Sequence, residues 1–368
     1  MKSSWLFALL VPLVACSGGS GSSPAPVQNT AVSASPINNS NPVGVGVNFW
    51  LDDLFPTKNF SGMRSLIRPA TSATARTTNL INCAVQVETN ASCNFNAIPL
   101  IGMEHSAPTV DQIMDRVLVS HDWMATRMRE ILEAMPVEAL LMTRGISAIV
   151  ISFDIRPSFY FPITSAIYID PNSLWLTDTE FGTIDPTPDF RSGFGGELQF
   201  TMPWRYVASG DEDIRSLERD LYSITLRTTS LFYHELAHAN DYFYPASLAT
   251  INRNTAIQNL SVSPRSAQLS GTFPLQSELM FRLADINFGG DSASAAQVAL
   301  TAGEVAFEFP ADAANDFYNF YTPREDFAMV FEEAMMLYSY DIDRDVAVTN
   351  SPQTSNACAD YIVAWGQR

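Results

Sequence analysis

The chain has 368 residues, with 39 acidic and 21 basic side chains and a formal net charge of −18 at pH 7. A surface this acidic repels the phosphate backbone, which argues against nucleic acid as a partner. The length allows one large domain, or two that pack closely, with a substantial core.

The first residues have the pattern of an export signal. Lys2 provides the basic start, and an apolar stretch over 5–14 follows that is too short to span a membrane. Leu13-Val14-Ala15-Cys16 then resembles the lipobox of bacterial lipoproteins, which implies cleavage before Cys16 and lipid attachment there. The alternative is an ordinary signal peptide followed by a coincidental cysteine. We predict a signal peptide over 1–15 and a protein that is lipid-anchored in the bacterial cell envelope, facing the periplasm or the cell exterior.

Residues 16–45 are rich in Gly, Ser, Pro and Asn, which predicts a flexible tether. The ordered domain is expected over 46–368, and its first portion, over 46–105, could be rich in β-strands. Beyond the signal peptide, no stretch of the sequence is long and apolar enough to cross a membrane.

The cysteines agree with export. Between Cys83 and Cys93 the sequence alternates apolar and polar residues and turns at Asn90. This pattern predicts a hairpin closed by a disulfide, in an oxidising compartment. Cys358 is then left over as a buried or free thiol.

The next predicted elements are a helix and two strands. A capping-box pattern at Thr109 and Gln112 opens an apolar periodicity typical of a helix, which ends before Pro136. Runs of apolar residues predict buried strands over 145–153 and 165–170.

A long loop is predicted over 178–196, because this stretch is rich in Gly, Pro, Asp and Thr. Such a loop inside a domain is often functional, for instance as a lid, although a decorative insertion is equally compatible with the composition. The sequence alone does not choose between these two interpretations.

The segment 213–244 has apolar residues at helical spacing and contains neither Gly nor Pro, so we predict one long helix there. His234, Glu235 and His238 form an H-E-x-x-H motif on this helix. The two histidines are one turn apart and point the same way, so their imidazoles can hold a zinc ion. Glu235 can take a proton from a metal-bound water. The alternative is a surface helix that happens to carry a pair of histidines.

A catalytic zinc site needs a third protein ligand and leaves a fourth position for water. Pro323 precedes a helical run, and Glu325 lies in its first turn, where the helix dipole stabilises a carboxylate. We predict Glu325 as the third ligand; a solvated acid at a helix start is the alternative. Asp241 and Glu278 are the other candidates for this position. Asp241 shares a helix face with both histidines, and its predicted role is to orient a ligand histidine.

This arrangement resembles the gluzincin metallopeptidases, which are zinc peptidases with an HExxH motif and a third ligand Glu on a second helix. The nearest likeness in motif is to the anthrax lethal factor branch, where HExxHxxD is followed by an E-x-F-A helix. Here these motifs are His234 to Asp241 and Glu325-Asp326-Phe327-Ala328. Met329 stands where gluzincins usually carry an acid.

The resemblance implies an α+β fold with a zincin-like catalytic domain. In that fold a mixed sheet lies above the active-site helix, and the C-terminal part is mainly helical. The resemblance also makes residues 166–169 a candidate edge strand that pairs with an extended peptide.

We therefore expect a lipid-anchored metallopeptidase that hydrolyses peptide or protein substrates by metal-activated water, with Zn²⁺ as cofactor and Glu235 as general base. The expected zinc ligands are His234, His238 and Glu325. Tyr318 or Tyr321 could donate to the oxyanion, or both could belong to an aromatic core. Two alternatives remain: a non-catalytic zincin-fold surface lipoprotein that binds a partner, and a metal-dependent amidase that acts on cell-wall peptides.

Overall fold

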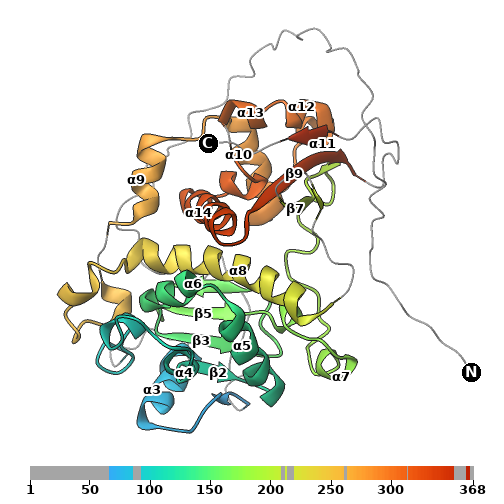
Figure 1. The fold of residues 1–368 in the computed structure, drawn as a ribbon. Helices are drawn as coiled ribbons and strands as arrows, with labels where there is room; N and C mark the ends of the chain where they lie inside the picture. Colours follow the sequence, from blue (N-terminus) through green and yellow to red (C-terminus); the bar gives the residue numbers. More distant parts are fainter. Residues whose placement is uncertain are drawn as a thin grey trace, which may run out of the picture.

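A computed structural model describes residues 66–85, 93–208, 212–213, 219–260, 263–312, 314–351 and 362–364. The predicted signal peptide, the lipidation site Cys16, the tether and Cys358 lie outside these ranges. No helix within them is long and apolar enough to cross a membrane. Figure 1 shows a lower part built around a sheet and an upper, largely helical part, with the long helix α8 (Leu221–Tyr242) between them.

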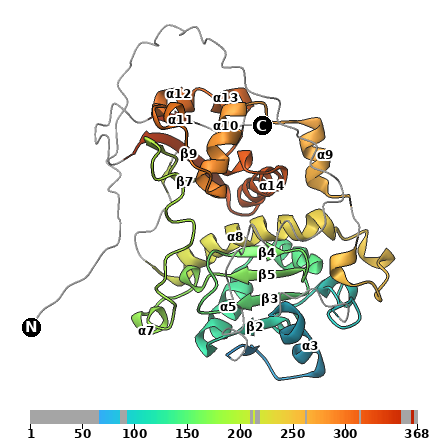
Figure 2. The same cartoon turned by 180° about the vertical axis from the view of Figure 1, so that it is seen from behind.

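A five-stranded mixed sheet forms the lower part, in the order β1-β2-β3-β5-β4. Its central strands β2 (Val117–Val119), β3 (Ala148–Ile151) and β5 (Ala166–Ile169) run parallel. β1 (Arg68–Pro69) and β4 (Phe159–Phe161) pair antiparallel at the two edges. Figure 2 shows these strands following one another from β2 to β4, with β4 next to α8.

Both faces of this sheet are buried, which explains why its central strands are apolar without alternation. One face packs against α5 (Asp122–Ala134), α6 (Val137–Met142) and α8, and the other packs against α3 (Ala75–Ala84). Within β3, Ile149 belongs to the first of these cores and Val150 to the second. α8 therefore rests on a sheet whose central strands are buried on both faces.

The upper part contains a second, antiparallel sheet in the order β10-β9-β7-β8. Its long central strands are β7 (Trp204–Ala208) and β9 (Ile342–Asn350). β8 (Glu212–Asp213) and β10 (Ile362–Ala364) flank them, and β6 (Phe200–Thr201) also pairs with β9.

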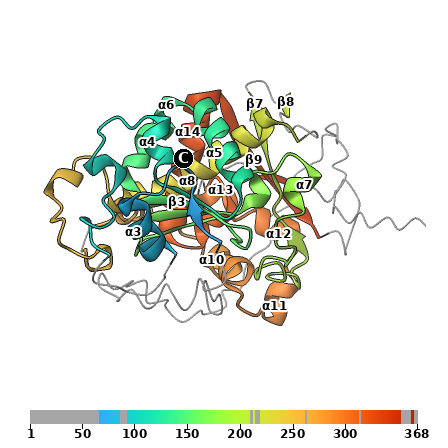
Figure 3. The same ribbon diagram turned by 90° about the horizontal axis from the view of Figure 1, so that it is seen from below.

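Short helices and one long helix complete the molecule. They are α4 (Val110–Met114), α7 (Asp178–Phe181), α9 (Arg265–Thr272), α10 (Glu278–Ala284) with a π-helical turn over Asp285–Gly289, α11 (Ala295–Val298), α12 (Ala302–Ala306), α13 (Phe309–Asp312), a 3₁₀ turn over Phe317–Phe320, and α14 (Pro323–Tyr340). α14 crosses α8 on the side away from the first sheet (Figure 1). Seen from below, that sheet and α3 lie in front of α14 (Figure 3).

The fold is α+β, as predicted, but the helix predicted from Thr109 to Pro136 is wrong as a single element. It consists of α4 and α5, separated by strand β2. Apolar residues at helical spacing continue across both helices, whereas a three-residue strand buried on both faces has no period of its own. The predicted capping box of Thr109 and Gln112 is present at the start of α4.

The predicted strands over 145–153 and 165–170 are confirmed in shorter form as β3 and β5. The prediction that residues 166–169 form an edge strand is wrong, because β5 pairs with β3 on one side and β4 on the other. The edge belongs to β4. The helix predicted over 213–244 begins later, since Asp220 caps α8 by accepting a hydrogen bond from the backbone N–H of Ser223 at 2.7 Å.

The described residues of the N-terminal portion are not rich in strands. Within 66–85 and 93–105 they form the two-residue strand β1 and the ten-residue helix α3. The predicted disulfide between Cys83 and Cys93 is present, but Cys83 lies in α3 and not in a hairpin. The expected turn at Asn90 lies outside the described residues.

Replacing both Cys83 and Cys93 by Ser should lower the free energy of unfolding by about 2–3 kcal/mol, because the bridge closes a loop in the unfolded chain. The two cysteines are 10 positions apart, so the loop is short and the loss is at the lower end of typical values. Urea denaturation followed by circular dichroism measures it. An unchanged midpoint would contradict a stabilising bridge.

Candidate metal centre

The candidate site lies where α14 crosses α8. α8 is helical through the whole HExxH segment, so His234 and His238 lie one turn apart, and both approach Glu325 of α14. Thr322 caps α14, and its side chain accepts a hydrogen bond from the backbone N–H of Glu325 at 3.2 Å. This cap, with Pro323 at the first helical position, begins α14 so that Glu325 faces the two histidines.

The structure brings the three predicted ligands together. His234 Nε2 lies 3.0 Å from Glu325 Oε2, and His238 Nε2 lies 3.3 Å from each of these two atoms. A tetrahedral metal with bonds of about 2.0–2.1 Å holds its ligand atoms about 3.3–3.4 Å apart. Two imidazole nitrogens and one carboxylate oxygen at this spacing fit a divalent transition metal, so the three groups could hold a metal ion.

Glu235 is buried beside this group and is only 4% exposed. Burial raises the pKa of its carboxyl, and the charges of His234 and His238 oppose that rise. The backbone N–H of Tyr160, in the edge strand β4, donates a hydrogen bond to the carboxylate. A carboxylate with a raised pKa next to the metal position is suited to receive and release a proton.

A second carboxylate, Glu332, holds the far side of the His234 ring. Its Oε2 lies 3.3 Å from His234 Nδ1, and its Oε1 accepts hydrogen bonds from Ser230 and from Arg344 Nη1, the latter at 3.0 Å. Burial opposes the ionisation of Glu332, but Arg344 and His234 outweigh it and lower the pKa of the carboxyl. An ionised Glu332 therefore fixes the ring so that Nε2 faces the metal position.

Arg344 comes from β9 and ties Glu332 to the upper sheet. Its Nε also pairs with Asp316 across 2.9 Å, and its guanidinium lies 4.0 Å from the ring centre of Trp204 in β7. The arginine is thus held between two acids and an aromatic face. Because both ion pairs of Arg344 are largely buried, the orientation of His234 is tied to the position of β9.

The prediction that Asp241 orients a ligand histidine is wrong. Its two carboxylate oxygens accept hydrogen bonds from the backbone N–H and the hydroxyl of Ser266, both at 2.7 Å. Asp241 therefore attaches the start of α9 to the end of α8. Glu278, the other candidate ligand, is exposed at the start of α10 and is not part of the group that could hold a metal.

Of the two tyrosines before Glu325, Tyr318 contacts the site. Its ring stacks on His234 with centroids 6.0 Å apart and on Tyr321 with centroids 5.9 Å apart. Burial and the nearby charge of Glu325 raise the pKa of Tyr318 well above its usual value, so its hydroxyl stays protonated. Both tyrosines also contact Phe288, so they belong to an aromatic cluster that borders the metal site.

The sequence analysis missed Glu332, Arg344 and Tyr160. Glu332 lies seven positions after Glu325 on the same helix, and that two-turn spacing was a signal that could have found it. Arg344 and Tyr160 come from strands β9 and β4. Strand pairing brings them to the site, and no local sequence pattern indicates that pairing.

Comparisons with known proteins found no matching family model, no matching curated protein and no matching solved structure. The chemistry of this site is therefore argued from its own residues.

The protein should bind about one divalent ion per chain, and Glu325→Ala should release most of it on dialysis. Elemental analysis measures the content, with Glu278→Ala as the matched control because that carboxylate is exposed and outside the group. Retention of metal by Glu325→Ala would contradict the assignment of the third ligand.

The affinity for metal should fall as the pH is lowered. Burial favours the neutral ring of His234, but hydrogen bonds to Glu325 and Glu332 outweigh it and raise the pKa of the metal-free imidazole well above its usual value. Metal must displace this proton, so binding weakens at every pH below that pKa. Titrations with a competing chelator between pH 6 and pH 9 measure how the metal affinity changes with pH. An affinity that does not depend on pH would contradict the hydrogen bonds of His234 to Glu325 and Glu332.

Glu332→Gln should weaken metal binding by roughly 10- to 100-fold, because the variant removes the charge that orients His234. Competition with a chelator measures the change. Glu278→Gln is the matched control, since its carboxylate is exposed and outside the group that could hold a metal. Equal effects in the two variants would show that a general loss of charge is responsible.

Proposed function

We propose that this protein is an exported, lipid-anchored zinc metallopeptidase with a zincin-like catalytic domain. The observation that carries the proposal is the convergence of His234, His238 and Glu325 on one point, with Glu235 buried beside them. The ligand side chains are 12%, 13% and 16% exposed, so solvent and substrate can reach the remaining side of the group.

The donor set supports zinc as the metal. Two neutral imidazoles and one carboxylate are a ligand set used by catalytic zinc, which keeps its fourth position for water or substrate. When bound, zinc supplies a Lewis acid that polarises a carbonyl oxygen and acidifies a water.

Glu235 is the proposed general base. Its carboxylate receives the proton of the attacking water and passes it to the amine that leaves when the peptide bond breaks. Because the pKa of Glu235 is raised, its carboxylate takes up a proton from water more readily than an ordinary carboxylate does. The N–H of Tyr160 holds the carboxylate in place. Tyr318, whose ring stacks on His234 and whose hydroxyl stays protonated, is the proposed donor to the oxygen on which negative charge develops.

Strand β4 supports a peptide as substrate. Among the described residues the strand ladder continues from β4 only to β5, so β4 is the strand of this sheet along which an extended peptide could lie. The N–H of Tyr160 on this strand reaches Glu235, so a peptide aligned there would pass the catalytic carboxylate. This is the role that the sequence analysis gave to residues 166–169.

Export is supported by two observations that do not depend on each other. The sequence Leu13-Val14-Ala15-Cys16 resembles a lipobox, which provides the lipid anchor at Cys16. The Cys83–Cys93 disulfide agrees with an oxidising compartment such as the periplasm or the cell exterior.

Glu235→Gln should keep the metal and lower the rate of peptide hydrolysis by at least about 100-fold, the contribution of a general base. The assay is cleavage of a mixed peptide library followed by mass spectrometry, with metal content measured in the same samples. Glu278→Gln serves as the control, because it removes a carboxylate that is remote from the site. Full turnover by Glu235→Gln would overturn the mechanism, and a parent protein that holds zinc but cleaves nothing would favour a binding protein.

A further inference from the structure

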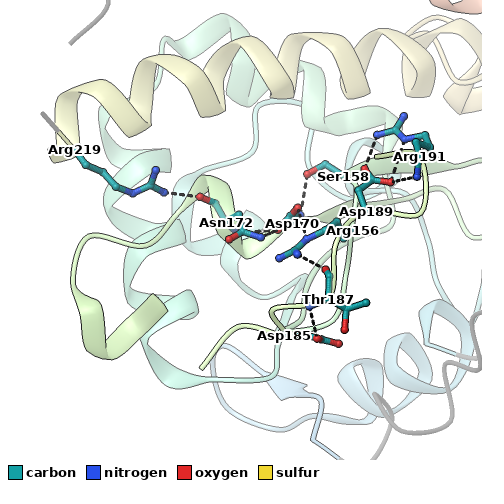
Figure 4. A network of polar contacts seen from close by, with 9 residues as sticks. All are labelled: Arg156, Ser158, Asp170, Asn172, Asp185, Thr187, Asp189, Arg191 and Arg219. Carbon is teal, nitrogen blue, oxygen red and sulfur yellow. Dashed lines mark hydrogen bonds and ion pairs between the residues drawn. The ribbon is translucent and has the colours of Figure 1, made fainter. Parts of the chain in front are cut away.

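A segment that leads from the lower part of the molecule to the upper part, residues 185–196, is held at both ends. Near its start, the backbone N–H of Asp185 donates to the carbonyl of Phe153 at 3.0 Å. Arg156 donates to the carbonyl of Thr187 and pairs with Asp170 across 3.3 Å. Figure 4 shows this network, which ties the segment to the loops that flank β4 and β5.

The other end of the segment packs against the π-helical turn after α10. Gly195 has a φ of +65°, and a Cβ there would lie 2.5 Å from the side-chain Oδ1 and 3.4 Å from the Cα of Asn287, so the segment lies directly against this turn. In the same turn, Phe288 packs edge-on against Tyr318 with ring centroids 4.6 Å apart. Tyr318 in turn stacks on His234. The segment therefore reaches the Tyr318 side of the metal site.

Arg191 lies between these two anchors. Its Nη2 and Nε donate to the two carboxylate oxygens of Asp189 at 3.0 and 3.4 Å, and its backbone N–H donates to the same carboxylate at 2.9 Å. These bonds occupy one edge of the guanidinium and fix its plane, as Figure 4 shows. The side chain remains 33% exposed.

The second edge of the guanidinium is formed by Nη1 and the remaining Nη2 hydrogen. It makes no hydrogen bond or ion pair with any of the described residues. The contact of this segment with the turn that carries Phe288 brings Arg191 to the Tyr318 side of the metal site, and its positive charge acts on both Tyr318 and Glu325. An arginine can hold two carboxylates at once, because its fork of donors offers two separate edges. Asp189 takes one edge and leaves the other for a ligand.

We propose that Arg191 determines substrate specificity by binding a carboxylate of the peptide, from either an acidic side chain or a free C-terminus. The proposal rests on the proposed peptidase function and deepens it. In a chain with a net charge of −18, an acidic peptide is repelled over most of the surface, so a fixed cation at the site is needed to admit one.

The test compares cleavage by zinc-loaded parent protein and Arg191→Gln. The substrates are matched peptides with Glu or Gln at each position around the bond, each made as a C-terminal acid and as an amide. We expect the parent to prefer one carboxylate-bearing series, and Arg191→Gln to lose about 10- to 100-fold in kcat/KM for that series alone. The position of the preferred Glu, or a preference for acids over amides, identifies the source of the carboxylate.

Arg129→Gln is the matched control, because Arg129 also pairs with an aspartate, Asp111, but on the exposed surface of α5. It should leave the preference unchanged. Arg191→Lys should recover part of the preference, since it restores the charge without the fork. An equal loss for acidic, neutral and amidated peptides would overturn the proposal and make Arg191 a general transition-state group.

Peptide binding separates this proposal from the proposed function. Fluorescence anisotropy with the same peptides is measured on zinc-loaded Glu235→Gln, with and without Arg191→Gln. Arg191-dependent binding of the carboxylate series, without any cleavage by the parent, would overturn the peptidase function and keep the carboxylate site. Cleavage by the parent without any carboxylate preference would keep the peptidase function and overturn the carboxylate site.

Discussion

The crossing of α14 over α8 is the contact on which the rest of the structure depends. It brings Glu325 to within 3.0 Å of His234, although 91 positions separate them in the chain. Polar pairs hold the crossing in one arrangement: Ser230 with Glu332, Tyr233 with Ser339, and Thr229 with Tyr340. Because hydrogen bonds require particular distances and directions, such pairs fix the position of the two helices more tightly than apolar contact alone. The buried first sheet below α8 supplies the rigid base.

The site also balances its own charge. Glu325 and Glu332 approach His234 from opposite ring nitrogens, and Arg344 with Asp316 continues this alternation of charge into the upper sheet. Without metal, the raised pKa of His234 keeps a proton on the ring, which neutralises part of the acid group. A divalent ion held by His234, His238 and Glu325 would take the place of that proton. The same side chains can therefore stay in nearly the same positions in both states, and little reorganisation accompanies binding.

Local sequence patterns were sufficient to predict those features whose residues lie within one helix or one short loop. The HExxH helix, the capped start of α14 with Glu325, and the Cys83–Cys93 pair could all be predicted, since each depends on spacing within one element or loop. Predictions failed where partners are distant in sequence. Asp241 and Glu332 both lie at helical spacing from a metal-site residue, so the sequence alone does not distinguish their roles. In the packed structure Asp241 binds Ser266, whereas Glu332 contacts His234. Strand β4 was missed for a different reason, because three residues are too few to show a periodicity.

The division of the site between the two parts has a consequence for how the protein matures. The histidines of α8 are made long before Glu325 and Arg344, and 86 positions of chain lie between His238 and Glu325. A ribosome or an export channel that releases the chain from its N-terminus therefore releases the motif first and its partners late. Contacts between such distant positions form last in folding. A nascent or partly folded chain thus carries the complete HExxH motif, but His234, His238 and Glu325 come together only after α14 has docked on α8.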